Sequence, residues 1–217
     1  MDTYPPPPWQ LTGTSVQVIR LVDISRVQGL VPPELRILPV LPGKTLAVLY
    51  CARYSAPSTL AYHELLVAPA VVNIGRRVGF WISHIYVDNP ASVRGGRHIW
   101  GLAKLLATFQ WNDGDREVRV EHESSLLCRI AWNNGSTLAR VPVVLPVISG
   151  RSKAFLHFSG TGSCRVGFRR AQIDVGGTLP DPGFSRARHA VLGDDLRLRI
   201  PAPIQLERSR SNDISSK

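Results

Sequence analysis

Short runs of aliphatic, β-branched and aromatic residues, separated by turn signals, recur along almost the whole of this 217-residue sequence. Such runs are typical of β-strands, because branched and aromatic side chains pack well on a pleated surface. Many short strands with tight turns favour a closed or sandwich-like antiparallel architecture. The predicted strands span residues 16–22, 46–53, 64–72, 77–87, 117–123, 126–132, 153–159, 164–175 and 195–200.

Turn and proline signals refine this series. Residues 112–115 (Asn-Asp-Gly-Asp) and 133–136 (Asn-Asn-Gly-Ser) predict hairpin turns, because their central residues tolerate positive φ. Pro142 and Pro146 lie in an apolar run at residues 141–148. Since proline cannot donate a ladder hydrogen bond, we expect that run to be an edge or irregular strand.

Helical candidates are few. One spans residues 24–30, just before Val31-Pro32-Pro33, and the other spans residue 92 to about residue 107. The chain has no repeat of fixed period and no dividing linker, so we expect one domain over residues 1–206. The polar residues 207–217 predict a frayed tail. The predicted fold class is therefore mainly antiparallel β with few short helices (α+β).

The composition indicates a folded chain without a membrane span. Hydrophobic residues make up 44% and charged residues 19%, which is enough apolar material for a core and unlike a disordered chain. No run approaches the ~18 uncharged apolar residues that a bilayer-spanning helix needs. The N-terminus lacks the basic and apolar regions of a signal peptide. We therefore expect a soluble protein of the cytoplasm.

The charge balance is basic, with a formal net charge of +10. Such a charge permits contact with nucleic acid or with an anionic membrane surface. The arginines are scattered along the chain, however, and no helix-turn-helix, zinc-finger or RNP motif accompanies them. We do not expect a nucleic-acid partner, and a nucleic-acid-binding module remains a third hypothesis that rests on charge alone.

The cysteine and histidine patterns do not indicate a metal site. Cys51, Cys128 and Cys164 lack paired spacing, so we expect buried free thiols and neither a disulfide framework nor a zinc site. The six histidines form no HExxH pattern, and Glu121-His122-Glu123 is typical of a solvated strand edge.

Lys104 is the residue that most strongly suggests chemistry. The chain has only four lysines (Lys44, Lys104, Lys153 and Lys217), and arginine supplies the other 22 of its 26 cationic side chains. Nearly every neighbour of Lys104 after His98 is apolar. A desolvated lysine can lose its proton and become a nucleophile, whereas arginine stays charged. On this pattern alone, the favoured alternative is a lysine whose stem covers apolar surface while its ammonium group reaches water.

The surrounding motifs resemble those of a known family. Residues 84–90 read His-Ile-Tyr-Val-Asp-Asn-Pro, residues 95–97 read Gly-Gly-Arg, and residues 100–104 read Trp-Gly-Leu-Ala-Lys. Together they resemble the acetoacetate decarboxylase family, in which a "DN.P" turn and a Gly-Arg-Glu triplet precede a Pro-Lys dipeptide whose lysine forms a Schiff base. Val31 to Leu35 is similar to the family's early "VPEPL" turn, and Tyr62-His63-Glu64 is similar to its strand with a catalytic glutamate.

The resemblance extends from about residue 9 to residue 111 and is most specific over residues 88–107. The Pro-Pro-Trp and Val-Asp-Asn-Pro patterns also resemble small decarboxylase-like proteins of cyanobacteria and, more distantly, the plant neoxanthin-deficiency protein. For the fold, the resemblance implies a closed β-barrel or cone. It also implies a homo-oligomer that needs no metal or organic cofactor.

The resemblance assigns roles to four residues. Lys104 corresponds to the imine-forming lysine, and Glu64 to a glutamate near the substrate. Arg97 corresponds to the arginine of the triplet and would support the site, most simply as a buried ion-pair partner. His98 replaces the triplet glutamate, either as a structural residue or as an acid–base group. Gly95-Gly96 predicts a tight turn that brings the backbone close to the site.

The sequence also departs from the family pattern. Leu105 stands where the family often has a second lysine, so desolvation alone would have to activate Lys104. The first family glutamate falls near residues 49–50, where no carboxylate exists. The arginine that binds the substrate carboxylate falls near Gly13, and Arg20 is the closest cation in sequence.

Two hypotheses follow from the resemblance. The first is a carbon–carbon lyase that acts on a β-keto acid through a Schiff base on Lys104, with assistance from Glu64. The second is a non-decarboxylating member, which either performs aldolase- or dehydratase-type imine chemistry or binds an apolar ligand such as a carotenoid. The missing arginine and first glutamate motivate the second hypothesis.

Overall fold

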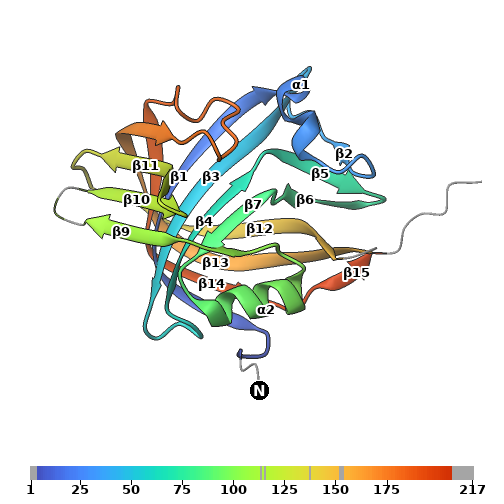
Figure 1. The fold of residues 1–217 in the computed structure, drawn as a ribbon, viewed down its shortest axis with the longest axis horizontal. Helices are drawn as coiled ribbons and strands as arrows, with labels where there is room; N and C mark the ends of the chain where they lie inside the picture. The colour runs from blue at the N-terminus through green and yellow to red at the C-terminus, as the bar shows by residue number, and fades with distance from the viewer. Residues whose placement is uncertain (1–3, 113, 115, 137, 152–153, 207–217) are drawn as a thin grey trace, which may run out of the picture.

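The computed structural model describes residues 4–112, 114, 116–136, 138–151 and 154–206 (Figure 1). The predicted tail at residues 207–217 lies outside the described residues. So do Asp113 and Asp115 of a predicted turn, and Lys153, the first residue of a predicted strand.

Strands dominate the described chain, as the sequence predicts, and the helices are short. The helical elements are α1 (Ile24–Val27), a 3-10 turn (Gln28–Leu30) and α2 (Pro90–Trp100). The strands are β1 (Trp9–Asp23), β2 (Arg36–Ile37), β3 (Lys44–Ser55), β4 (Tyr62–Ala68), β5 (Ala70–Ile74), β6 (Arg77–Trp81), β7 (His84–Val87), β8 (Leu105–Leu106), β9 (Thr108–Asn112), β10 (Glu117–His122), β11 (Ser125–Trp132), β12 (Arg140–Arg151), β13 (Ala154–Val175), β14 (His189–Ile200) and β15 (Ile204–Leu206).

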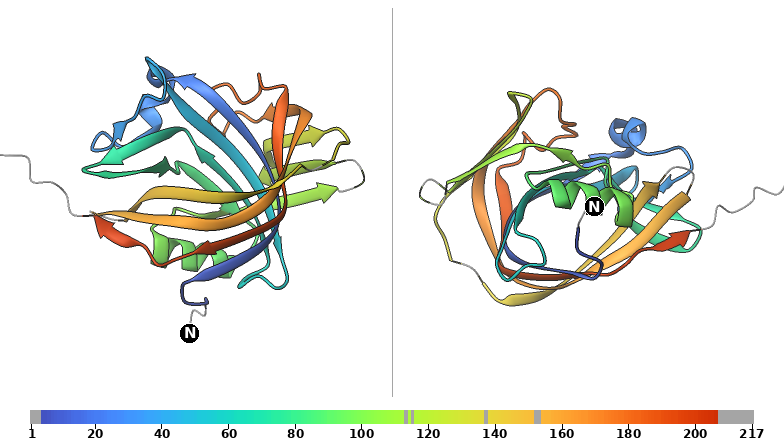
Figure 2. Two further views of the ribbon diagram at one scale, coloured as in Figure 1. Left: turned by 180° about the vertical axis from the view of Figure 1, so that it is seen from behind. Right: turned by 60° about the horizontal axis from the view of Figure 1, so that its bottom comes forward.

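The strands form one large, mainly antiparallel sheet in the order β2-β5-β6-β12-β13-β14-β1-β3-β4-β7-β8. A branch of β9, β10 and β11 joins it where β11 pairs with the second half of β13. The sheet is strongly curled, and α2 lies across one end of it (Figure 2). The expected closed barrel is not confirmed, because no pairing joins β2 to β8 in the described part of the chain. Both end strands have only two residues, which leaves little backbone for a closing ladder.

Several strand boundaries differ from the prediction for local reasons. The run at 64–72 is two strands, β4 and β5, because Pro69 between them cannot donate a ladder hydrogen bond. Conversely, the two runs predicted at 153–159 and 164–175 belong to the single strand β13. Gly162 within it is needed for close packing, since a Cβ there would lie 1.7 Å from the Arg197 carbonyl oxygen.

The predicted hairpin at residues 133–136 is wrong. These residues connect β11 to β12, which do not pair with each other. The loop instead follows β13, where the buried Arg169 donates from Nη2 to the Gly135 carbonyl oxygen at 2.5 Å. The edge character predicted from Pro142 and Pro146 is confirmed, because both pair only with β13 and the pairing of β12 with β6 begins at Val147.

Helix α2 is shorter than predicted, and this changes the position of Lys104. The Asn89 side chain caps the helix by accepting from the N–H groups of Ala91 and Ser92. The helix ends because Gly101 adopts a left-handed conformation (φ 63°). The prediction of a helix to residue 107 is therefore wrong, and Lys104 lies in the loop between α2 and β8. The predicted helix at 24–30 is confirmed as α1 and its 3-10 extension.

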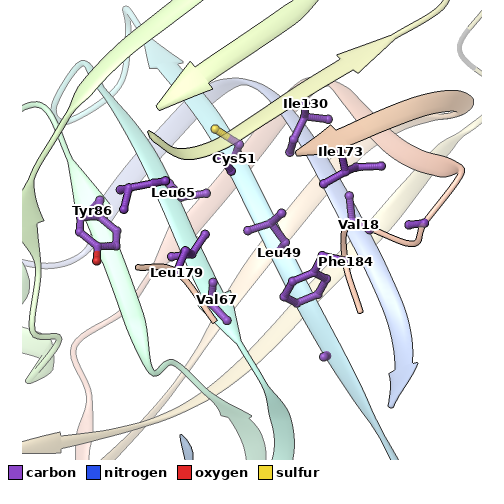
Figure 3. Packing of buried hydrophobic residues seen from close by; sticks show 14 of the residues in the cluster. Val18, Leu49, Cys51, Leu65, Val67, Tyr86, Ile130, Ile173, Leu179 and Phe184 are labelled. Carbon is purple, nitrogen blue, oxygen red and sulfur yellow. The ribbon is translucent and has the colours of Figure 1, made fainter. Parts of the chain in front are cut away.

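One face of the central strands β1, β3 and β4 is tightly packed. Its side chains are fully buried beneath residues of β11, β13 and the segment at 179–184 (Figure 3). The residues of this packed face and its cover include Val16, Val18, Leu49, Cys51, Leu65, Val67, Ile130, Ile173, Leu179 and Phe184. Because side chains alternate along a strand, the intervening residues of β1, β3 and β4 point to the opposite face.

Candidate active site

The opposite face of these strands lines a cavity of about 250 Å³. Alternate residues contribute from β1, β3 and β4, and further walls come from β6, β7, β12, β13, β14 and the loop after α2. The lining residues include Gln17, Ile19, Val48, Tyr50, Tyr54, Tyr62, Glu64, Leu66, Ala68, Phe80, Ile82, Leu102, Lys104, Leu145, Val147 and Phe158. The cavity is thus largely apolar, with one cation and one carboxylate among its described lining residues.

Lys104 and Glu64 form a buried ion pair in this cavity. Lys104 Nζ donates to Glu64 Oε2 at 2.8 Å and to Ser92 Oγ at 3.1 Å. The residues are only 3% and 7% exposed, respectively. The lysine comes from the loop after α2, the glutamate from β4 and the serine from the first turn of α2. The alternative of a lysine that extends its ammonium group into water is therefore wrong.

The backbone of Lys104 is held from outside the cavity. Arg97 donates to the Lys104 carbonyl oxygen from Nε at 2.9 Å and from Nη2 at 2.6 Å. Gly96 lies against the lysine stem, and a Cβ at this position would come within 2.5 Å of Lys104 Cδ. The Gly-Gly-Arg motif therefore shapes the site through space and backbone contacts. The predicted tight turn at Gly95-Gly96 is wrong, since both glycines are helical.

Three tyrosine hydroxyls surround the Glu64 carboxylate. Tyr62 donates to Oε2 at 3.4 Å, and Tyr54 donates to Oε1 at 3.5 Å. Tyr50 shares a hydrogen bond of 3.1 Å with the Tyr54 hydroxyl. Burial is the main cause that raises the pKa of each of these three hydroxyls, and the nearby charge of Glu64 adds to it. All three are therefore neutral near pH 7 and available as hydrogen-bond donors.

Two tryptophans close the cavity at the end where Lys104 lies. The rings of Trp9 and Trp100 meet edge to face with centroids 4.7 Å apart. Trp9 also packs on Gly95, where a Cβ would come within 2.6 Å of the indole. Lys104 Nζ lies 5.0 Å from the Tyr62 ring centroid and 6.0 Å from that of Trp9. Both distances lie within the range of a cation–π contact.

The other end of the cavity is open to solvent. Ile19 lines this end and is 47% exposed, whereas Trp9 and Trp100 are each 2% exposed. In the strand register Ile19 lies opposite Val48, which pairs with Ala68, four residues beyond Glu64 on β4. At roughly 3.3 Å per residue, the mouth lies about 13 Å along the strand from Glu64. An elongated ligand would therefore reach Lys104 with one end first.

The structure separates the four residues singled out by the sequence. Lys104 and Glu64 lie together in the cavity. Arg97 is exposed and bound to a carbonyl oxygen, so it is not the buried ion-pair partner that we expected. His98 is exposed on the outer side of α2, with Nδ1 3.2 Å from the Tyr4 hydroxyl. Arg20, the cation nearest in sequence to the family arginine, is not among the lining residues.

The sequence reasoning missed Ser92 and Tyr54. Ser92 lies three residues after the Asn89 cap, so it points from the first turn of α2 toward the site. Tyr54 lies opposite Tyr62 across the β3–β4 ladder. The only available signal was the alternation of Tyr62 and Glu64, which places both side chains on one face of β4.

The described residues contain no cluster of three or more His, Cys, Asp or Glu side chains that could hold a metal ion. Cys51, Cys128 and Cys164 are buried free thiols, as predicted. No helix in the described part of the chain is both long and apolar enough to cross a membrane.

The family model "Acetoacetate decarboxylase (ADC)" matches residues 1–159. The chain belongs to the acetoacetate decarboxylase family. The resemblance seen in the motifs around Lys104 is thereby confirmed, and the match extends beyond residue 111 into β13.

Curated relatives include Protein NEOXANTHIN-DEFICIENT 1 of rice (Oryza sativa subsp. japonica), which is 29% identical over 109 residues. The protein of the same name from Arabidopsis thaliana is 27% identical over 109 residues. Each match covers 50% of this chain but only 36% and 38% of the two plant proteins. This chain thus matches little more than a third of these relatives' length.

Solved structures share the fold. An acetoacetate decarboxylase from Legionella pneumophila superposes with a TM-score of 0.68 at 15% identity, covering 97% of this chain and 92% of that chain. The enduracididine biosynthesis enzyme MppR complexed with pyruvate gives a TM-score of 0.69 at 14% identity, with 94% and 92% covered. At such low identity these similarities establish the fold and leave the reaction open.

Proposed function

We propose that this chain is an imine-forming enzyme in which Lys104 attacks a carbonyl substrate and Glu64 carries the protons. The observation that supports this most directly is the position of the Lys104 amine. It is 3% exposed, lies 2.8 Å from the Glu64 carboxylate and projects into an apolar cavity.

The first step is the generation of a free amine. An ammonium group cannot attack a carbonyl carbon, so Lys104 must pass a proton to Glu64 Oε2 along the 2.8 Å hydrogen bond. Burial of two charges is unfavourable, and proton transfer within the pair removes both. Ser92 Oγ accepts a hydrogen bond from Nζ and thereby holds one N–H group of the amine.

Imine formation follows. The neutral Lys104 nitrogen attacks the carbonyl carbon, and one proton passes from that nitrogen to the carbonyl oxygen, which gives a neutral carbinolamine. The hydroxyls of Tyr54 and Tyr62 donate to the Glu64 carboxylate at rest, and once Glu64 holds a proton they can turn to the oxygen that gains charge. The carbinolamine hydroxyl takes the proton held on Glu64 and leaves as water. The result is an iminium on Lys104 beside a Glu64 carboxylate.

A β-keto acid would then lose carbon dioxide. The electrons of the broken carbon–carbon bond move into the iminium, and the resulting enamine is protonated and hydrolysed. This lyase reaction is the one that the family resemblance implies. It needs the substrate carboxylate to be held near the iminium, which is a task for a cation.

A non-decarboxylating reaction is the second candidate. Its support is the absence of any arginine, and of a second lysine, from the described lining of the cavity. The iminium could instead lose a proton to Glu64 and form an enamine, the intermediate of aldol and dehydration reactions. MppR, a structural neighbour, has been solved with the condensation product of pyruvate and imidazole 4-carboxaldehyde. Simple binding of an apolar ligand such as a carotenoid remains the alternative without imine chemistry.

The decisive experiment is reductive trapping. The folded protein is mixed at neutral pH with acetoacetate, pyruvate or an aliphatic ketone and reduced with borohydride, and peptide mass spectrometry locates the adduct. We expect an adduct on Lys104 with at least one carbonyl compound. Lys104→Met should give none, whereas Lys44→Gln, a change at a partly exposed lysine paired with Asp23, should leave the adduct intact.

If none of the carbonyl compounds gives an adduct, and circular dichroism shows that the protein is folded, imine chemistry is refuted. Measurement of carbon dioxide release from the same mixtures separates decarboxylation from other reactions of the imine.

A further inference from the structure

The described lining of the cavity offers no free charge to a ligand. Lys104 and Glu64 are the two charged residues among the lining side chains, and they bind each other. The remaining polar groups are the hydroxyls of three tyrosines and the amide of Gln17, and all other lining side chains are apolar. A ligand therefore contacts uncharged hydroxyl groups beside the Lys104 amine and mainly apolar side chains in the rest of the cavity.

Two arginines that the sequence analysis considered for the site, Arg97 and Arg20, are directed elsewhere. Arg97 donates from both Nε and Nη2 to the Lys104 carbonyl oxygen, on the outer side of the loop. Arg20 follows Ile19 on β1, and Gln17 and Ile19 are the β1 residues of that region that line the cavity. By strand alternation Arg20 belongs to the face opposite the cavity.

A carboxylate next to the reacting carbonyl would be poorly accommodated. It would lie beside the Glu64 carboxylate, and like charges at such distances repel strongly in a medium of low polarity. An unpaired charge among aromatic and aliphatic side chains also loses its hydration without compensation. A neutral carbonyl compound avoids both penalties, and each methylene that it buries against the walls tightens binding.

We infer that the substrate is a neutral aldehyde or ketone with a hydrocarbon chain, which enters from the Ile19 end with its carbonyl group first. This inference rests on the proposed imine chemistry and specifies its substrate class. A water molecule in the liquid occupies ~30 Å³. If each non-hydrogen atom of the ligand takes the same volume, the cavity of about 250 Å³ holds about eight such atoms. A longer chain would extend through the open mouth.

With no carboxylate to lose, the iminium reacts by proton transfer. Glu64 has given its proton to the departing water and is again a carboxylate. It removes a proton from the carbon next to the iminium, the C–H electrons form the carbon–carbon double bond of an enamine, and the C=N pair returns to nitrogen. The step is reversible, so in deuterium oxide it replaces the α-hydrogens of the ketone with deuterium.

The test compares two compounds that differ only by carbon dioxide. 2-Heptanone and 3-oxooctanoate share the same chain, and only the second carries a carboxylate beside the ketone. Borohydride trapping on the wild-type protein at a series of concentrations gives the half-saturating concentration of each. We expect 2-heptanone to saturate at a concentration at least tenfold lower than 3-oxooctanoate. Acetone should bind more weakly than 2-heptanone by about fourfold for each methylene removed.

A cationic side chain introduced into the cavity provides a second test. Leu66 lines the cavity two residues beyond Glu64 on β4. Leu66→Arg should shift the preference toward 3-oxooctanoate by tenfold or more, whereas the matched Leu66→Met should not. If Leu66→Arg does not fold, the wild-type comparison still decides. Deuterium exchange at the α-carbons of 2-heptanone, followed by NMR, should be detectable for the wild-type protein and lost in Glu64→Gln.

The outcomes separate the two proposals. A Lys104 adduct with both compounds and an equal or greater preference for 3-oxooctanoate would overturn the neutral-substrate inference and leave imine chemistry standing. No adduct with either compound, or with the keto acids used above, would overturn imine chemistry itself.

Discussion

The two faces of the strands β1, β3 and β4 differ both in composition and in surroundings. On β4, Leu65 and Val67 are fully buried against the cover of the packed face (Figure 3). Leu66 and Glu64 of the same strand face the cavity. Large side chains such as Phe184 fill the first face, whereas the second is closed only at one end, by the two tryptophans. The location of the cavity on this sheet therefore depends on the side chains of each face and on the elements that cover it.

The largest expected effect lies on the packed face. Leu49 is fully buried there, and Leu49→Ala would leave a cavity among tightly packed neighbours. We expect the free energy of unfolding to fall by about 2–5 kcal/mol in urea denaturation. The yield of Lys104 adduct per folded molecule should be unchanged. A loss below about 1 kcal/mol would mean that this face can collapse around the change.

The second effect lies on the cavity side and concerns chemistry more than stability. Gly96→Ala places a methyl group against the Lys104 stem, which must then shift from its position beside Glu64. We expect trapping of Lys104 to slow by tenfold or more, as measured by the rate of adduct formation. Gly29→Ala is the matched control, because a Cβ at Gly29 has no heavy atom within 4 Å. An unchanged trapping rate in Gly96→Ala would show that the lysine position is not critical.

The third effect measures how far water reaches the cavity face. The raised pKa of the Tyr54 hydroxyl means that the folded protein keeps its proton at a pH where the unfolded chain, with a pKa of about 10, has lost it. The stability contribution is complete below about pH 10 and is lost as pH rises toward the folded-state pKa. Tyr54→Phe should therefore lose less stability than the wild type between pH 9 and pH 11, by up to about 1.4 kcal/mol per pH unit above 10. Parallel stability curves would mean that Tyr54 is hydrated.

The smallest effect is expected for a truncation facing the cavity. Leu66→Ala removes side-chain contacts that are already incomplete on one side, so we expect a loss of less than about 1 kcal/mol in the free energy of unfolding. Measured beside Leu49→Ala, it compares the same chemical change on opposite faces. Equal losses for the two variants would contradict the distinction between the faces.

Most strands could be predicted because their apolar runs are interrupted by strong turn signals. The predicted boundaries were wrong where the structural role of a residue depends on contacts with residues distant in the sequence. Gly101 ends α2 although the apolar pattern continues through Leu102, and Gly162 permits close strand packing rather than a break. Closure of the sheet was not predictable either, because it depends on how much ladder the short end strands can form.

Lys104 and Glu64 could each be singled out from motifs, since each residue lies in a recognisable segment, but their ion pair was not predicted. Their other partners could not be foreseen. Tyr54 joins the site through the register of β3 against β4, and Ser92 joins it through the approach of α2. The sequence associated Arg97 with the site as a buried ion-pair partner, but its contact with the Lys104 carbonyl oxygen depends on where α2 ends.

Ligand binding in the cavity also couples the thermal stability of this protein to the concentration of its ligands in solution. A molecule that binds only the folded chain raises its stability by RT ln(1 + [L]/Kd), about 2.7 kcal/mol at a hundredfold excess over Kd. For a chain of this length, each kcal/mol shifts the midpoint of thermal unfolding by roughly 2–4 °C. A library of unlabelled carbonyl compounds can therefore be ranked by melting temperature alone, before any reaction is known. A shift in the midpoint of thermal unfolding therefore serves as an assay for the physiological ligand.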